Sequence, residues 1–205
     1  MKTVMGIISA LFLFASPWVL YWCLTRHSVE VAAYTVLGWV ILRTIPVVVA
    51  ASPAQRRAAL QLPAIALAFT LTGLISHNGT WLLVMPSATQ ATFGLAFFRS
   101  LSSTPLIEHF ARMVKPVLSD GELEHCRTWT KIWGVYLFVL AGIGLGFAKW
   151  ASLGAWTLYV GVVSYVLVGV LFAVEHVIRK IQFRDYSRNP LDWLLSKLFP
   201  ARSSA

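Results

Sequence analysis

Six apolar runs, each about the length that a helix needs to cross a lipid bilayer, dominate this sequence. A hydrocarbon core about 30 Å thick requires about 20 apolar residues of α-helix, and a helix satisfies its backbone hydrogen bonds internally. The runs therefore predict an all-α fold: a polytopic membrane helical bundle of about six transmembrane helices, with interfacial amphipathic helices on the cytoplasmic side. They fall at about residues 4–24, 31–51, 60–76, 80–98, 131–149 and 153–177.

The composition argues against a water-soluble core. Of the 205 residues, 58% are hydrophobic and 12% are charged, and the mean hydropathy is +0.70. Six crossings leave no room for a separate soluble catalytic domain. We predict a six-span membrane domain over residues 1–188, whose first run is a span and not a cleaved signal peptide. Residues 189–205 form a predicted amphipathic tail, where Asn189-Pro190 begins a short helix with leucines on one face.

The basic residues are biased to one side of this arrangement. A net charge of +9 would suggest nucleic acid in a soluble protein, but these charges lie beside the ends of apolar runs, so we expect no nucleic-acid partner. Arg26 and Lys149 fall on the other side, and Arg43 lies within a span. By the positive-inside rule, the biased side is cytoplasmic, which places both termini in the cytoplasm of a bacterial inner-membrane protein. Fourteen of the 17 basic residues fall on this side: Lys2, Arg56, Arg57, Arg99, Arg112, Lys115, Arg127, Lys131, Arg179, Lys180, Arg184, Arg188, Lys197 and Arg202.

Tryptophan positions agree with that orientation. Tryptophan is enriched where a membrane meets water, because its ring is apolar and its N–H is polar. Trp22, Trp81, Trp150 and Trp156 all fall at ends of runs that face outside. We therefore predict that these four residues form an outer aromatic belt.

The third and fourth runs are the weakest of the six. Only His77-Asn78-Gly79 joins them, and the fourth run is polar for a helix that faces lipid. Its polar side chains could line the bundle interior or a cavity, or the segment could be a broken helix. Pro86, which removes a backbone donor, also fits an ordinary kinked span. The polar residues of this run are Ser87, Thr89, Gln90 and Thr92.

The polar stretch over residues 99–130 predicts two helices at the cytoplasmic surface. Thr104-Pro105 is typical of a helix start, with threonine as the cap and proline in the first helical position. Ser119-x-x-Glu122 matches a capping box, which would open a second helix running directly into the fifth span. The first helix would place one apolar face in the membrane interface: Leu106, Ile107, Phe110, Met113 and Val114.

Two charged residues within the predicted spans suggest an intramembrane ion pair. Arg43 lies about two turns inside the second run, where an arginine is costly unless it is paired, hydrated or able to reach the interface. Glu175 lies at a compatible depth in the sixth run, so we predict that it pairs with Arg43. The alternative is that Arg43 extends to the cytoplasmic interface by itself.

Charged clusters near the cytoplasmic surface could bind an anionic ligand or a partner protein. Glu175-His176-x-x-Arg179 could hold a phosphate or carboxylate, and the alternative is charge that only fixes topology. His125-Cys126 raises the possibility of a cysteine nucleophile, but neighbours on a helix point about 100° apart, which argues against a dyad. The candidate surface comprises Arg112, Lys115, Glu124, His125, Arg127, His176, Arg179 and Lys180.

Motifs for catalysis and metal binding are missing from the sequence. It contains no His-x-x-x-x-Asp acyltransferase motif, no Gly-x-Ser-x-Gly elbow, no Walker loop and no spacing of histidines and cysteines that favours zinc. We therefore assign no catalytic residue, no metal site and no cofactor. The sequence favours a role that is not enzymatic, without excluding catalysis.

Residues 90–185 resemble a family of uncharacterised multi-span bacterial membrane proteins. The resemblance lies in Thr104-Pro105-Leu106-Ile107, Phe110-Ala111-Arg112, Glu124 to Thr130 with Trp133, and Glu175-His176-x-x-Arg179. Members occur in gene clusters for aryl-polyene and xanthomonadin-type pigments, beside ketosynthases, acyl carrier proteins, acyltransferases and an exporter. The resemblance implies a role in such fatty-acid-like biosynthesis. The label "ketosynthase" that some members carry does not fit a chain without a soluble two-lobed fold.

Three functions remain compatible with the sequence. The leading hypothesis is an inner-membrane accessory or scaffold protein, whose basic cytoplasmic helices dock acyl carrier protein or soluble biosynthetic enzymes, with membrane lipids as its other partners. The first alternative is a carrier or flippase for an acyl or lipid intermediate, which would use the polar fourth run and the pair of Arg43 and Glu175. The second alternative is a membrane-bound transferase.

Overall fold

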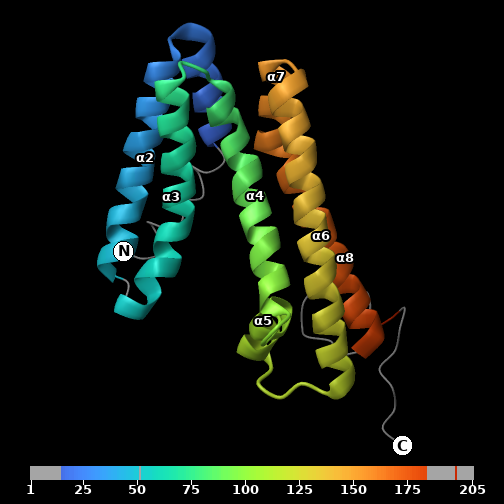
Figure 1. Cartoon of the computed structure of the whole chain (residues 1–205). Helices are drawn as coiled ribbons and strands as arrows, with labels where there is room; N and C mark the ends of the chain where they lie inside the picture. Colours follow the sequence, from blue (N-terminus) through green and yellow to red (C-terminus); the bar gives the residue numbers. More distant parts are fainter. Residues whose placement is uncertain (1–14, 51, 184–196, 198–205) are drawn as a thin grey trace, which may run out of the picture. The chain divides into compact units, whose positions relative to one another are not determined.

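The computed structural model describes residues 15–50, 52–183 and 197. Every regular element among them is helical and none is a strand (Figure 1), which confirms the predicted all-α class. Residues 15–26 form a helix. The further helices in chain order are α2 (Val29–Ala50), α3 (Pro53–Ile75), α4 (Thr80–Ser100), α5 (Leu106–Val114), α6 (Asp120–Trp150), α7 (Leu153–Leu158), the π-helical turn η1 (Tyr159–Val163) and α8 (Ser164–Phe183).

Four helices of the described part are long and apolar enough to cross a membrane. They are Val29–Pro46 within α2, the whole of α4, the whole of α6, and the continuous helix Leu153–Phe183 that α7, η1 and α8 make together. Ala59–Ile75 of α3 is apolar but shorter. The count of six crossings stays a prediction. The predicted tail over residues 189–205 and the start of the first run lie outside the described residues, except for Lys197.

The prediction that a helix from the capping box would run into the fifth span is confirmed. The α6 helix is unbroken over 31 residues. At 1.5 Å per residue its length is about 46 Å, which exceeds a hydrocarbon core of about 30 Å. Part of α6 must therefore extend beyond the hydrocarbon core of any bilayer that it crosses.

The chain divides into two compact units. Unit 1 comprises Met1–Phe93 and Tyr136–Ser164, and unit 2 comprises Gly94–Val135 and Tyr165–Ala205. The α4 and α6 helices and the helix Leu153–Phe183 contribute residues to both units. Each unit has its own cluster of buried apolar side chains.

In unit 1, a tight turn joins α3 to α4. His77 adopts a positive φ of 50°, and the side-chain oxygen of Asn78 accepts a hydrogen bond of 2.9 Å from the Thr80 N–H, which caps the start of α4. His77 Nδ1 lies 2.8 Å from Glu30 Oε1 in the first turn of α2. The α2 and α3 helices lie side by side (Figure 1). The two weakest predicted crossings are therefore two separate helices.

Trp156 belongs to the core of unit 1 and not to an aromatic belt. Its side chain is 1% exposed, and its Nε1 donates a hydrogen bond of 3.1 Å to the Leu83 carbonyl. The belt prediction was wrong for this residue, because a position near a helix end does not decide which face of the helix is buried. Trp22, Trp81 and Trp150 are 55%, 39% and 78% exposed, as a belt requires.

The polar residues of α4 belong to an unbroken helix. The hydroxyls of Thr89 and Thr92 donate to carbonyls one turn earlier in α4, at 3.0 and 2.8 Å. Ser87 is buried against Gly144 of α6, where a Cβ atom would collide with Ser87 Oγ. Of the alternatives for this run, the broken helix is excluded, and Pro86 lies inside a continuous α-helix.

The π-helical turn η1 packs against α6 in unit 1. The hydroxyl of Tyr159, its first residue, donates a hydrogen bond of 2.8 Å to the Leu140 carbonyl. The Tyr159 ring stacks on Phe147, with ring centres 4.8 Å apart. These two contacts join the helix Leu153–Phe183 to α6.

Candidate functional site

Unit 2 contains all eight residues of the predicted ligand or partner surface. They lie on α5, on the first turns of α6 and on the last turns of α8, apart from Lys115, which directly follows α5. A buried apolar cluster packs beneath these elements, with Phe97, Leu123, Val168 and Leu171 against it. The cluster comprises Ile107, Ala111, Leu118, Cys126, Trp129 and Trp133.

The start of α5 depends on other helices for its hydrogen bonds. Proline was predicted in the first helical position behind a cap at residue 104, but α5 begins at Leu106, and Pro105 is an N-cap without a side-chain bond. The Leu106 N–H donates to Ser100 Oγ at 3.0 Å, and the Ile107 N–H donates to Thr130 Oγ1 at 3.3 Å. The predicted cap was wrong, because hydroxyls from α4 and α6 satisfy these donors.

The predicted apolar face of α5 is divided between the core and the outside. Ile107 is buried in the cluster, whereas Phe110, Met113 and Val114 are 53%, 69% and 89% exposed. Val117, just beyond the helix, is 80% exposed. This outward apolar side is suited to a membrane interface, as predicted for this helix.

Acidic side chains of unit 2 partly neutralise the basic residues around α5. Arg112 Nε lies 2.8 Å from Glu108 Oε1, and its guanidinium also donates to the Pro116 carbonyl at 3.1 Å. Lys115 Nζ lies 2.9 Å and 3.0 Å from the two carboxylate oxygens of Glu122. These two ion pairs carry no net charge, so Arg112 and Lys115 attract an acidic partner less than their sequence suggests.

Glu122 also completes one half of the predicted capping box. Its Oε2 accepts a hydrogen bond of 2.8 Å from the Ser119 N–H and another of 3.0 Å from the Ser119 hydroxyl. In a complete capping box the serine hydroxyl would bind the backbone instead. Glu122 is 4% exposed, and its three donors compensate a buried carboxylate.

His125 connects α6 to α8 and keeps one ring nitrogen without a partner. The side chain is 6% exposed, and Nδ1 lies 3.0 Å from Gln182 Oε1, so Nδ1 carries the hydrogen. The edge of Phe183 and the ring of Trp129 lie against the imidazole, with ring centres 5.4 and 5.8 Å away. Nε2 is buried without a hydrogen bond among the described residues. Such an atom destabilises the fold unless another group reaches it.

Cys126 is a core residue and not a partner of His125. It is fully buried in the apolar cluster, and its carbonyl accepts a hydrogen bond of 2.7 Å from Thr130. Neither ring nitrogen of His125 bonds the thiol, because Nδ1 bonds Gln182 and Nε2 has no hydrogen-bond partner among the described residues. The arrangement agrees with the expectation that the two neighbours point in different directions.

Glu175 has a partner that the sequence did not indicate. The carboxylate is 8% exposed, and its Oε2 accepts a hydrogen bond of 3.1 Å from Trp133 Nε1. Arg43 is exposed on α2, and its guanidinium carbon lies 5.6 Å from the centre of the Trp39 ring. Arg43 belongs to unit 1 and Glu175 to unit 2, so their ion pair stays a prediction.

The other charged residues of the predicted surface differ in exposure. Glu124 and Arg127 are exposed on α6, whereas His176, Arg179 and Lys180 on α8 are half-buried. Arg179 lies close enough to His125 and Cys126 for its charge to act on both. In unit 2, Arg179 of the predicted Glu175-His176-x-x-Arg179 site therefore lies near the first turns of α6.

Several hydrogen-bonding residues of this site were missed in the sequence. Thr130, Ser100 and Gln182 are isolated polar residues, and nothing in their spacing indicates which helix they contact. The Gln182 side chain bonds a histidine 57 positions away. A hydrophobic pattern predicts which face of a helix is buried, but not the partner of a single polar group on it.

No protein-family model, curated protein or solved structure matches the sequence. Among residues 15–50, 52–183 and 197, no group of three or more histidine, cysteine, aspartate or glutamate side chains could hold a metal ion. A proposal for the function must therefore start from the charges and contacts of unit 2.

Proposed function

We propose that this chain is an integral membrane protein that crosses the bacterial inner membrane six times, with both termini in the cytoplasm. Four helices support this by length and apolar composition. Large apolar side chains on them are exposed, as contact with lipid requires, including Ile41, Val139 and Val166. The orientation rests on the distribution of basic residues.

Reporter fusions test the topology. Alkaline phosphatase, which is active only outside the cytoplasm, is expected to be active after Gly79 and after Ala151. Green fluorescent protein is expected to fluoresce after Ser103 and after Ala205. Active phosphatase at Ser103, or an inactive fusion at Gly79, would refute the six-crossing topology.

The proposed role is that of an accessory or scaffold protein in the synthesis of an aryl-polyene-type pigment or a similar fatty-acid-like lipid. One observation carries this proposal: Arg127 and Lys131 are exposed one turn apart on α6, and no carboxylate of the described residues forms a salt bridge with either. Two such cations favour an acidic partner, such as acyl carrier protein or a soluble biosynthetic enzyme. The resemblance to proteins of pigment gene clusters supports the same class of partner.

Co-purification tests the docking surface. Acyl carrier protein is expected to co-purify with the tagged wild-type chain from native membranes, and the double variant Arg127→Glu/Lys131→Glu is expected to lose it. The matched control is Arg26→Glu, an exposed arginine that the topology places on the other side. Equal recovery of the carrier protein with the double variant and the control would refute docking at these residues.

The carrier alternative would use the polar residues of α4 and the pair of Arg43 and Glu175. The hydroxyls of Thr89 and Thr92 donate within the helix, so they could act on a ligand only as acceptors. The metabolites of a deletion strain distinguish the two roles. Loss of early intermediates favours the scaffold, whereas finished product that accumulates in the membrane favours the carrier.

A further inference from the structure

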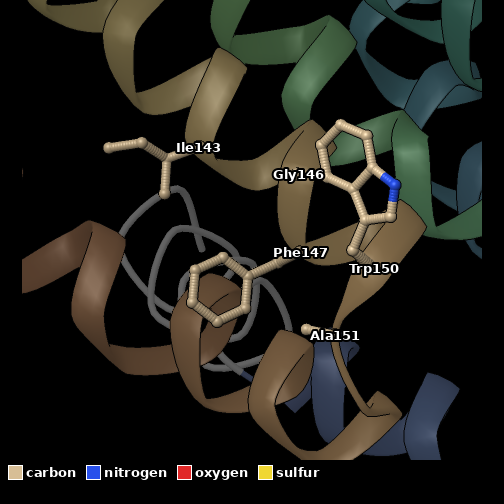
Figure 2. Close-up of a pocket in the computed structure, with 5 residues that line it drawn as sticks. All are labelled: Ile143, Gly146, Phe147, Trp150 and Ala151. Atoms are coloured by element: carbon tan, nitrogen blue, oxygen red, sulfur yellow. The ribbon is translucent and has the colours of Figure 1, made fainter.

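An open apolar groove lies at the end of α6 in unit 1. Its volume is about 290 Å³, and the described residues that line it are Ile143, Gly146, Phe147, Trp150 and Ala151. Figure 2 shows the indole of Trp150 beside Gly146, with Phe147 directly after Gly146 and Ile143 one turn earlier. Because Phe147 stacks on Tyr159, one wall of the groove is held in place.

The space in the groove depends on the missing side chain at Gly146. Among the described residues, a Cβ atom there would meet the Trp150 ring at 3.7 Å, which is an ordinary contact. A longer side chain would occupy the groove itself. Ile143 and Trp150 are 40% and 78% exposed, so the groove opens outward. On a crossing helix, such a surface faces lipid.

Lys149 adds a positive charge at the rim of the groove. Its Nζ lies 5.1 Å from the centre of the Trp150 ring, and the side chain is exposed. The sequence has no aspartate or glutamate between Glu124 and Glu175, and no carboxylate of the described residues forms a salt bridge with Lys149. The charge is therefore available to a phosphate outside the protein.

We propose that this groove binds an anionic phospholipid, with one acyl chain against Gly146 and Phe147 and the headgroup phosphate beside Lys149. Tryptophan commonly lies at the level of the headgroups, where Trp150 would separate the two parts of the lipid. The apolar lining accepts any acyl chain, whereas the cation favours a headgroup with net negative charge by about fivefold. The site rests on the membrane crossings proposed above, because only they bring the groove to lipid.

Native mass spectrometry of the full chain tests the site. The chain is reconstituted into nanodiscs of equimolar phosphatidylcholine and phosphatidylglycerol with the same acyl chains, and the lipids retained on release are counted. Gly146→Leu fills the groove, and Lys149→Gln removes its charge. The matched controls are Gly142→Leu, on the same helix with open space around it, and Arg26→Gln, an exposed arginine in unit 1.

The wild type and both controls are expected to retain phosphatidylglycerol about fivefold over phosphatidylcholine. Lys149→Gln should retain lipid with a ratio of about one, and Gly146→Leu should retain about tenfold less lipid than Gly142→Leu. Equal retention by the two glycine variants, or an unchanged ratio in Lys149→Gln, would overturn the site. Resistance of the wild type to alkaline carbonate extraction tests the crossings separately, so failure of the site and failure of the proposed topology are distinguishable.

Discussion

Gly144 of α6 faces Ser87 of α4 without room for a side chain, because a Cβ atom at Gly144 would collide with Ser87 Oγ. We expect Gly144→Ala to lower the free energy of unfolding by about 1–3 kcal/mol, because the new Cβ would displace Ser87 Oγ. Ser87→Ala should restore part of the stability in the double variant, since it removes the closest atom in conflict but leaves Tyr159 Cε1 at 3.3 Å from the new Cβ. Thermal unfolding in detergent measures both.

Gly142 provides the control for that prediction. It lies on the same helix, and apart from the backbone of α6 and the adjacent residues, no atom of the described part of the chain lies within 4 Å of a Cβ added there. Gly142→Ala should therefore stabilise the protein by up to about 1 kcal/mol through helix propensity alone. If Gly144→Ala behaves in the same way, the close contact with Ser87 is not formed.

Thr130 is a buried hydroxyl that serves two helices. It is fully buried, accepts a hydrogen bond from the Ile107 N–H of α5 and donates to the Cys126 carbonyl of α6. Thr130→Val has nearly the same shape but leaves the Ile107 N–H without an acceptor, so we expect a loss of about 1–3 kcal/mol in unfolding free energy. Faster hydrogen exchange at the Ile107 amide would locate the change at the start of α5.

Thr128→Val is the matched control, because Thr128 is exposed two residues earlier on α6. It should change the stability by less than about 0.5 kcal/mol. Thr130→Ser keeps the hydroxyl and should retain more stability than Thr130→Val. The reverse order would contradict the hydrogen bond to α5.

At the level of the element, the α6 helix depends both on local sequence signals and on contacts with residues outside the helix. The capping box and the following apolar run predict one continuous helix, and the structure confirms it. The Glu122 carboxylate of this capping box also accepts a hydrogen bond from Lys115, which lies before the helix and outside the box. The start of α6 is therefore held by Glu122 more than by Ser119.

Glu122→Ala should consequently cost more than Ser119→Ala. The glutamate variant loses the acceptor for the Ser119 N–H and leaves Lys115 unpaired, and we expect it to lower the unfolding free energy by about 1–3 kcal/mol. Ser119→Ala keeps the backbone bond and should cost less than about 1 kcal/mol. Chemical denaturation in detergent compares the two with Glu124→Ala, an exposed acid two residues after Glu122. A larger loss of unfolding free energy for Ser119→Ala would show that the Ser119 hydroxyl contributes more to the cap than Glu122 does.

At the scale of the whole molecule, the ion pair of Arg43 and Glu175 would join unit 1 to unit 2. If the pair forms, Arg43→Glu and Glu175→Arg should each lower the yield of folded protein, because each leaves two like charges together. Reversing both charges should restore most of that yield. Size-exclusion chromatography of the detergent-solubilised protein measures it.

The opposite result would show that Arg43 and Glu175 each act only through contacts within their own unit. If Glu175→Arg is harmful alone and the double reversal does not rescue it, the loss stems from the hydrogen bond between Glu175 and Trp133 inside unit 2. Arg43→Gln should then be harmless, because the exposed Arg43 side chain lies over Trp39 and can reach the interface.

The sequence by itself determined the helical class, the positions of the long apolar helices and the continuity of α6. These features depend on hydrophobicity over about 20 residues and on local capping, and both kinds of information lie close together along the chain. The orientation, the number of crossings and the biosynthetic role stay predictions of the same kind, from charge bias and resemblance.

Only the tertiary structure decided the partner of each polar side chain. Trp156 was expected at an interface and is buried, Glu175 bonds Trp133, and Lys115 is paired with Glu122. The physical reason is that a hydrogen bond or an ion pair depends on atomic positions within a few tenths of an ångström, which the hydrophobic pattern along the chain does not specify. The apolar runs make four helices long and apolar enough to cross a membrane, but the packing of small residues such as Gly144 sets how closely the helices approach.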